Sequence, residues 1–115
     1  MREADSRELV LWLLGLRRRY RVIGDSMQPT LSAGEEVLID PRAYRSRTPR
    51  RGELVVAHHP QKYDLQIIKR IAAVQTDGRC LLRGDNPDPS RSSDSIVEPD
   101  LIRGRVTCRF GSERA

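Results

Sequence analysis

From Tyr20 onward, the chain is a succession of short apolar runs separated by turn-forming residues, and no later stretch keeps a helical period. Runs of this kind, bounded by Gly, Pro, Asn and Asp, are typical of strands. Asp77-Gly78 has the chemistry of a hairpin turn. The pattern predicts an all-β domain with strands at residues 20–23, 36–40, 54–58, 66–75, 79–83 and 102–109.

A short helix is expected ahead of this domain, within residues 1–19. Asp5 and Ser6 are suitable caps, and the segment ends in the three arginines 17–19, which matches the preference of a helix dipole. Its apolar run, 9–16, is far shorter than the roughly 20 residues that span a bilayer. We expect the helix to pack on the domain formed by residues 20–115, with contact to a membrane surface or to a partner as alternatives.

Composition narrows the class of protein. The chain has 115 residues, 37% hydrophobic and 32% charged, which suits one folded, soluble domain and not a disordered chain. Cys80 and Cys108 lie apart from other metal-ligating residues, and no cleavable signal peptide is visible, so we expect free thiols, no metal and a cytoplasmic location. The net charge of +5 comes almost wholly from arginine. It predicts a solvated basic surface, or one that faces phosphate, an acidic protein or a membrane.

The stretch 22–31, Val-Ile-Gly-Asp-Ser-Met-Gln-Pro-Thr-Leu, places one serine in a turn. A short apolar strand ends at Gly24, and Pro29 stops regular structure soon afterwards. Such a turn holds the hydroxyl of Ser26 at the edge of a cleft. Because a serine alone is a poor nucleophile at neutral pH, the stretch requires a base elsewhere in the chain.

Lys69 is one candidate for that base. Strand alternation puts Lys69 on the same face as Ile67 and Ile71, and burial of that face would lower the lysine pKa from its reference of about 10.4. A neutral lysine is a general base. Two alternatives stay open from the residues: a lysine whose charge reaches solvent, and a Ser-His-Asp arrangement that uses His58 or His59.

A third stretch, 83–95, is dense in turn formers and hydroxyls that could orient a lysine amine. Together and in this order, the stretches resemble the signal peptidase I superfamily of serine proteases, which use a Ser-Lys dyad. Residues 26–31 resemble its nucleophile motif, 34–39 the next strand motif, 68–71 the general-base motif, and 84–86 with 92–95 its last motif. The resemblance covers about residues 20 to 106 and implies a signal-peptidase-like β-barrel or complex β fold.

The resemblance also implies roles for single residues. Ser26 would be the nucleophile, with its N–H in the oxyanion hole, and Lys69 the general base. Ser92, or else Ser90, would orient the lysine. Further support would come from Gly24, Asp25 and Asp94, and substrate contacts from Met27 and Pro29. The chain departs from the family where Ile96 replaces an arginine, which removes one ion-pair partner that the family pattern implies for Asp94.

Within the superfamily, the chain is most similar to the small proteases that mature nickel-type superoxide dismutase, through residues 21–31, the His59-Pro60 pair and Leu-Arg-Gly-Asp-Asn-Pro at 82–87. That similarity implies a leader-bearing nickel superoxide dismutase precursor as partner and no cofactor for the protease. One alternative is a general signal peptidase for exported preproteins. Another is a non-catalytic, arginine-rich nucleic-acid-binding β-barrel, against which the few aromatic residues argue. We therefore expect no nucleic acid partner.

Overall fold

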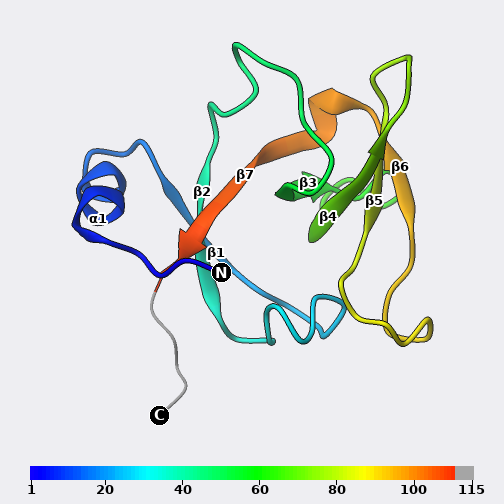
Figure 1. The fold of residues 1–115 in the computed structure, drawn as a ribbon, viewed down its shortest axis with the longest axis horizontal. Coiled ribbons are helices and arrows are strands. Elements are labelled where there is room, and N and C mark those ends of the chain that lie inside the picture. Colours follow the sequence, from blue (N-terminus) through cyan, green and yellow to red (C-terminus); the bar gives the residue numbers. More distant parts are fainter. Residues whose placement is uncertain (111–115) are drawn as a thin grey trace.

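The computed structural model describes residues 1–110, and most of these form one strongly curled, antiparallel sheet (Figure 1). Its strand order is β1-β2-β7-β3-β4-β5-β6. This confirms the predicted all-β class. Residues 111–115, the end of the predicted domain, lie outside the described residues. The strands are β1 Arg18–Arg21, β2 Glu36–Asp40, β3 Leu54–His58, β4 Gln66–Val74, β5 Cys80–Arg83, β6 Ser95–Val97 and β7 Ile102–Arg109, with a 3₁₀ turn η1 at Pro99–Leu101.

The strand predictions are close to the structure, with differences in the bounds of β1, β4 and β5 and one strand that was not predicted. β4 ends one residue earlier than predicted, at Val74, and β5 begins one residue later, at Cys80. β2, β3 and β7 have the predicted bounds, and the hairpin turn before β5 is present, with Gly78 at a φ of 89°. β1 begins and ends two residues earlier than predicted, because Arg18–Arg21 pairs with β2 from Arg18↔Ile39 to Arg21↔Glu36. β6 was not predicted. Its three residues lie in a polar segment and become a strand only by pairing with β5.

The amino-terminal helix, α1, spans Ser6–Leu13 and is shorter than predicted. The Asp5 side chain caps it by accepting a hydrogen bond from the Glu8 N–H at 2.9 Å. It ends because Gly15 adopts a left-handed φ of 79°. The prediction that the three arginines 17–19 close the helix is therefore wrong, since the chain has already turned toward β1.

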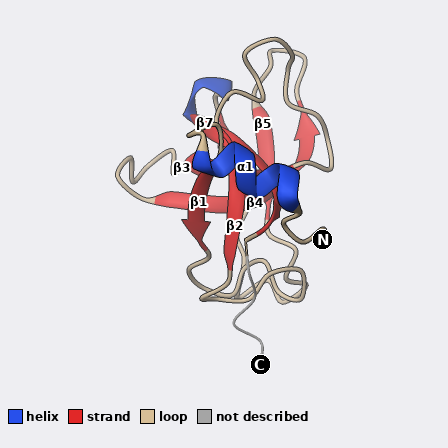
Figure 2. Cartoon of the chain, turned by 90° about the vertical axis from the view of Figure 1, so that its left-hand side faces the viewer, coloured by secondary structure: helices blue, strands red, loops and turns tan. Residues whose placement is uncertain are grey.

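α1 lies across one side of the sheet, as the second view shows (Figure 2). It is held there by the buried Glu8 carboxylate, which accepts a hydrogen bond from Arg17 Nε at 3.1 Å, and by Trp12, whose ring is 4.7 Å from that of Phe110. Leu13 and Leu14 remain exposed. Within residues 1–110, no helix has the length and apolar character that a bilayer crossing requires.

The core consists of two hydrophobic clusters that the alternation of β3 separates. Leu54 and Val56 belong to the first cluster, while Val55 and Ala57 belong to the second. The first cluster also takes in Val22, Met27 and Leu31, from the segment after β1. Cys80 and Cys108 are buried free thiols, as predicted. The consequence for the site is that the Ser26 segment is anchored in the core on both sides of the serine.

Candidate active site

The segment after β1 presents Ser26 because its apolar neighbours are buried. Val22 and Met27 are 2% and 1% exposed, and Leu31 is fully buried. Between them the chain reverses through Gly24, whose φ of 77° is a conformation that favours glycine. Ser26 itself is only half-buried. The burial of its neighbours thus fixes the backbone while the hydroxyl stays accessible.

The Gly84-Asp85-Asn86 loop holds the backbone of this segment. The Asn86 N–H donates a hydrogen bond to the Ser26 carbonyl at 2.9 Å, and the Asn86 side-chain amide donates to the Asp25 carbonyl at 2.8 Å. Gly84 lies so near the Ser26 carbonyl oxygen that a Cβ there would collide with it. Glycine at this position is therefore required by space.

Asp85 adds a second brace. Its carboxylate accepts two hydrogen bonds from the Arg70 guanidinium, at 2.8 and 2.7 Å, and a third from the Thr30 hydroxyl at 2.6 Å. The Arg70 bonds hold the Asp85 pKa below its usual value. Three segments are joined at this carboxylate: β4, the Gly-Asp-Asn loop and the end of the serine segment. Sequence reasoning did not assign this role to Arg70, Asp85 or Thr30.

Lys69 is buried, at 7% exposure, on the strand face that it shares with Ile67 and Ile71. This burial counts against the alternative in which the lysine charge reaches solvent. Burial lowers the Lys69 pKa, and the negative charge of Asp94 partly opposes that shift. Both the direction and its cause agree with a lysine that gives up its proton more readily than usual.

Ser26 and Lys69 line the same pocket, of about 230 Å³. Its other walls include Tyr20, Ile23 and Leu65. No hydrogen bond joins the two side chains within residues 1–110, and neither bonds to another side chain there. Bonds between catalytic groups are commonly long before substrate arrives. The pocket thus brings together a hydroxyl and an amine that are 43 positions apart in the sequence.

The backbone around Ser26 suits an oxyanion hole. In the described part of the chain, no acceptor takes the Ser26 N–H, so this donor is available to a ligand. Gly24 is exposed two residues earlier. The Asp25 side chain points to Arg91, whose Nη1 donates to it at 3.1 Å. These positions agree with the expected supporting places of Gly24 and Asp25, whose roles stay predictions.

In the loop after β5, the two serines that are candidates for orienting Lys69 have different partners. Ser92 Oγ accepts a hydrogen bond from the Gly84 N–H at 3.1 Å, beside the serine segment, whereas Ser90 is exposed and bonds Asp88 at 2.8 Å. Neither hydroxyl bonds Lys69 among the described residues. Asp94 has an ion-pair partner in spite of Ile96, because Arg83 pairs with it at 2.9 Å.

Other predicted residues lie away from this pocket. The Met27 side chain is packed in the core, which counts against direct contact with substrate, while Pro29 is exposed. Neither histidine lines the pocket. His58 stacks on Tyr63, with ring centroids 4.8 Å apart, and His59 Nδ1 accepts two backbone hydrogen bonds within its own loop. Residues 1–110 contain no group of three His, Cys, Asp or Glu side chains placed to hold a metal ion.

Comparison with known proteins identifies relatives of this chain. A family model described as signal peptidase, peptidase S26, matches residues 9–81, which include Ser26 and Lys69. The chain is 34% identical to signal peptidase I of Aquifex aeolicus (strain VF5) over 58 residues, 50% of this chain and 23% of that protein. It is 30% identical to mitochondrial inner membrane protease subunit 1 of Xenopus tropicalis over 107 residues, 75% of this chain and 64% of that protein.

The family model covers more than half of the chain, and the fold and the pocket agree with it. The chain therefore belongs to the signal peptidase family, peptidase S26. It spans less than two thirds of the length of either relative.

Proposed function

We propose that this protein is a serine endopeptidase that removes the amino-terminal leader of a precursor protein, with Ser26 as nucleophile and Lys69 as general base. The observation that carries the proposal is the shared pocket: a half-exposed serine beside a buried lysine whose pKa is lowered. Family membership supports the class of reaction.

The reaction follows from these two groups. The neutral amine of Lys69 takes the hydroxyl proton as Ser26 Oγ attacks the scissile carbonyl, and the Ser26 N–H donates to the developing oxyanion. The tetrahedral intermediate breaks its C–N bond, and Lys69 gives the proton to the leaving amine. Lys69 then takes a proton from water, whose oxygen attacks the acyl-enzyme. The same proton returns to Ser26 as the ester bond breaks, which restores both groups.

A partly open strand edge supports binding of an extended peptide. Pairing between β4 and β5 begins at Arg70↔Arg83, so in the described part of the chain residues 66–69 of β4 have β3 as their strand partner. At the other edge, the Gln66 carbonyl accepts a hydrogen bond from the Tyr20 hydroxyl, and the backbone beyond it toward Lys69 is left for a peptide. An extended peptide that adds to such an edge gains backbone hydrogen bonds and places alternate side chains in pockets. The exposed side chains of Ile23 and Leu65 flank the site and suit apolar residues of a leader.

For the substrate, we propose the nickel superoxide dismutase precursor, cleaved in the cytoplasm. The support is the similarity of residues 21–31 and 82–87 to the proteases that mature this enzyme. The second candidate is processing of exported preproteins, which the name of the Aquifex relative favours.

The test is incubation of the purified protein with a leader-bearing nickel superoxide dismutase precursor and, separately, with a secretory preprotein, followed by mass measurement of the products. We expect one cut in the first substrate. Ser26→Ala and Lys69→Met should abolish it, whereas Lys62→Met, at the other lysine of the chain, should not. Cleavage by either dyad variant would refute the mechanism. Cleavage of the secretory preprotein alone would select the second substrate.

A further inference from the structure

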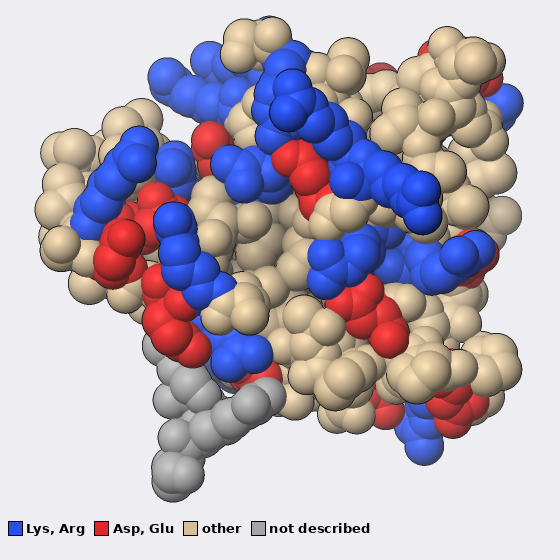
Figure 3. Space-filling view, viewed as in Figure 1, with Lys and Arg blue, Asp and Glu red and all other residues tan. Residues whose placement is uncertain are grey.

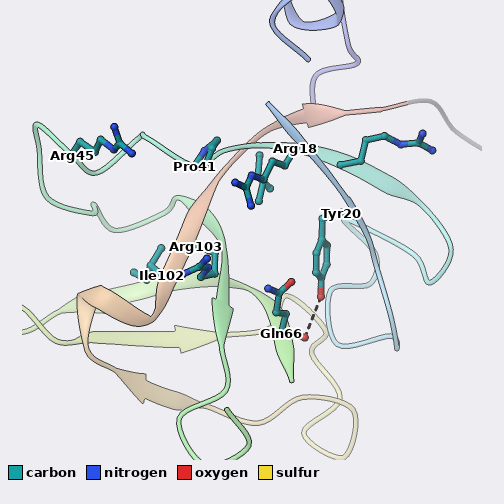
Figure 4. A pocket seen from close by; sticks show the side chains of 9 residues that line it. Arg18, Tyr20, Pro41, Arg45, Gln66, Ile102 and Arg103 are labelled. Carbon is teal, nitrogen blue, oxygen red and sulfur yellow. Dashed lines mark hydrogen bonds between the residues drawn. The ribbon is translucent and has the colours of Figure 1, made fainter. Parts of the chain in front are cut away.

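A second pocket, of about 400 Å³, lies beside the Ser26 pocket and is strongly basic. Arg18 comes from β1, Arg45 from the loop after β2 and Arg103 from β7 (Figure 4). Among residues 1–110, no Asp or Glu lines this pocket. In the space-filling view, basic side chains gather over the upper and central part of this face (Figure 3). Arg19 of β1 also lines the pocket, but it is paired with Glu36. The other three arginines come from separate segments, so the cluster is a product of folding.

These three arginines differ from their neighbours in the chain. Arg17 pairs with Asp40, Arg19 with Glu36 and Arg105 with Glu53. In contrast, Arg18, Arg45 and Arg103 form no ion pair within residues 1–110. Guanidinium groups that line one pocket without a carboxylate among them repel one another, and an anion bound between them reduces that repulsion. The pocket therefore has the charge and donors of an anion site.

The basic pocket adjoins the Ser26 pocket. Tyr20 and Gln66 line both, and the Tyr20 hydroxyl donates a hydrogen bond to the Gln66 carbonyl at 3.2 Å. Burial raises the pKa of the Tyr20 phenol, so it keeps its proton. One wall runs from Arg18 through Tyr20 to Ser26, and the other runs along β4 from Gln66 to Lys69. A peptide held at the dyad would extend toward the arginines.

We infer that the basic pocket binds the carboxylate of an Asp or Glu in the precursor, a few residues from the scissile bond. The inference rests on the proposed function, and it adds a requirement on the substrate. An extended peptide advances about 3.3 Å per residue, so a neighbouring pocket is reached within a few positions. Arginine forks match carboxylate geometry better than lysine does.

The structure favours an acidic peptide over a lipid surface. A bilayer would take up exposed apolar side chains next to the cations, yet the exposed Leu13 and Leu14 of α1 do not line this pocket. The pocket is also walled by Gln66 and lies next to the dyad, where the substrate must pass. Anionic vesicles are therefore the competing ligand in the test.

The first experiment scans one glutamate, against glutamine, through the positions on both sides of the cut in a leader peptide. We expect one position at which glutamate raises kcat/KM about tenfold relative to glutamine, mostly by lowering KM. An effect of this size corresponds to about one charge-assisted hydrogen bond. In the double variant R18Q/R103Q, the glutamate and glutamine peptides should be cleaved with equal kcat/KM. The matched control R51Q removes an exposed arginine outside the pocket and should keep the preference. Equal cleavage of both peptides at every position would overturn the inference.

The second experiment uses binding alone, so it separates this inference from the proposed activity. Ser26→Ala protein is titrated with the selected glutamate peptide, its glutamine twin, and vesicles with or without phosphatidylglycerol. If no leader is cleaved, peptides with two adjacent glutamates or glutamines serve as the pair. We expect tighter binding of the glutamate peptide, weakened by salt and lost in R18Q/R103Q. Vesicle binding that needs these arginines, with no peptide preference, would overturn the inference.

Discussion

Replacement of Gly84 by alanine should disable the site while the fold remains. A Cβ at this position would lie closer than 3.0 Å to two oxygen atoms, the Ser26 carbonyl oxygen and Ser92 Oγ. Ordinary contact begins at 3.4 Å, so the neighbours must retreat. The Ser92 side chain can rotate away. The Ser26 carbonyl belongs to the backbone of the proposed nucleophile, and it can retreat only if the serine moves.

The size of the effect follows from that displacement. A shift of about 1 Å in a catalytic group costs about a hundredfold in rate. We therefore expect kcat/KM for leader cleavage to fall about a hundredfold in Gly84→Ala. Overpacking of this kind costs about 1–3 kcal/mol in the free energy of unfolding, which leaves the protein folded. The assay is cleavage of the leader substrate, with thermal unfolding measured on the same samples.

Two further variants serve as controls for this prediction. Gly78→Ala, in the β-turn, places a Cβ at a φ of 89° with nothing nearer than 3.8 Å, so it should lower stability with unchanged cleavage. Gly84→Ala combined with Ser92→Gly relieves one of the two collisions and should recover only part of the activity. Full activity in Gly84→Ala alone would refute the role of the contact between Gly84 and the Ser26 carbonyl. Full recovery in the double variant would assign the loss of activity to the collision with Ser92.

Three other substitutions test the site at separate points. Asp94→Asn removes the negative charge that raises the Lys69 pKa, so kcat/KM should begin its rise with pH at a lower pH; an unmoved pH–rate profile would contradict this. Asp85→Asn weakens the brace to Arg70 and should cost about 1–3 kcal/mol in denaturant unfolding together with a lower kcat. Met27→Ala should cost about 2–5 kcal/mol as a core substitution, with KM unchanged in the folded protein; a raised KM at unchanged stability would restore the predicted substrate contact.

The sequence predicted the elements whose residues carry their own signal. β2, β3 and β7 are apolar runs between polar residues, and their bounds agree with the structure. The helix end was predicted wrongly because the pairing of Arg18–Arg21 with β2 outweighs the favourable charge of arginines at a helix end. β6 is defined by its partner and has almost no pattern of its own.

The same distinction applies to the site. Ser26 stands out by the glycine before it and the proline after it, and Lys69 by the isoleucines that share its face. The braces have no such signal, because they join residues far apart: Arg70 and Asp85 are 15 positions apart, and Asn86 is 61 positions from Asp25. The partner of Asp94 was missed for the same reason, since Arg83 reaches it across a loop.

β4 connects the two parts of the site, which are Lys69 and the loop that holds the Ser26 segment. Lys69 and Arg70 are consecutive, so they face opposite sides of the strand. Lys69 lines the pocket that it shares with Ser26, while Arg70 holds Asp85, whose neighbour Asn86 holds the Ser26 carbonyl. A displacement of β4 therefore moves Lys69, the proposed base, together with the residues that hold Ser26, the proposed nucleophile. The distance between the Lys69 amine and the Ser26 hydroxyl therefore depends on the contacts that run from β4 through the Gly-Asp-Asn loop to Ser26. Changes in α1, which lies outside that path, should leave cleavage intact.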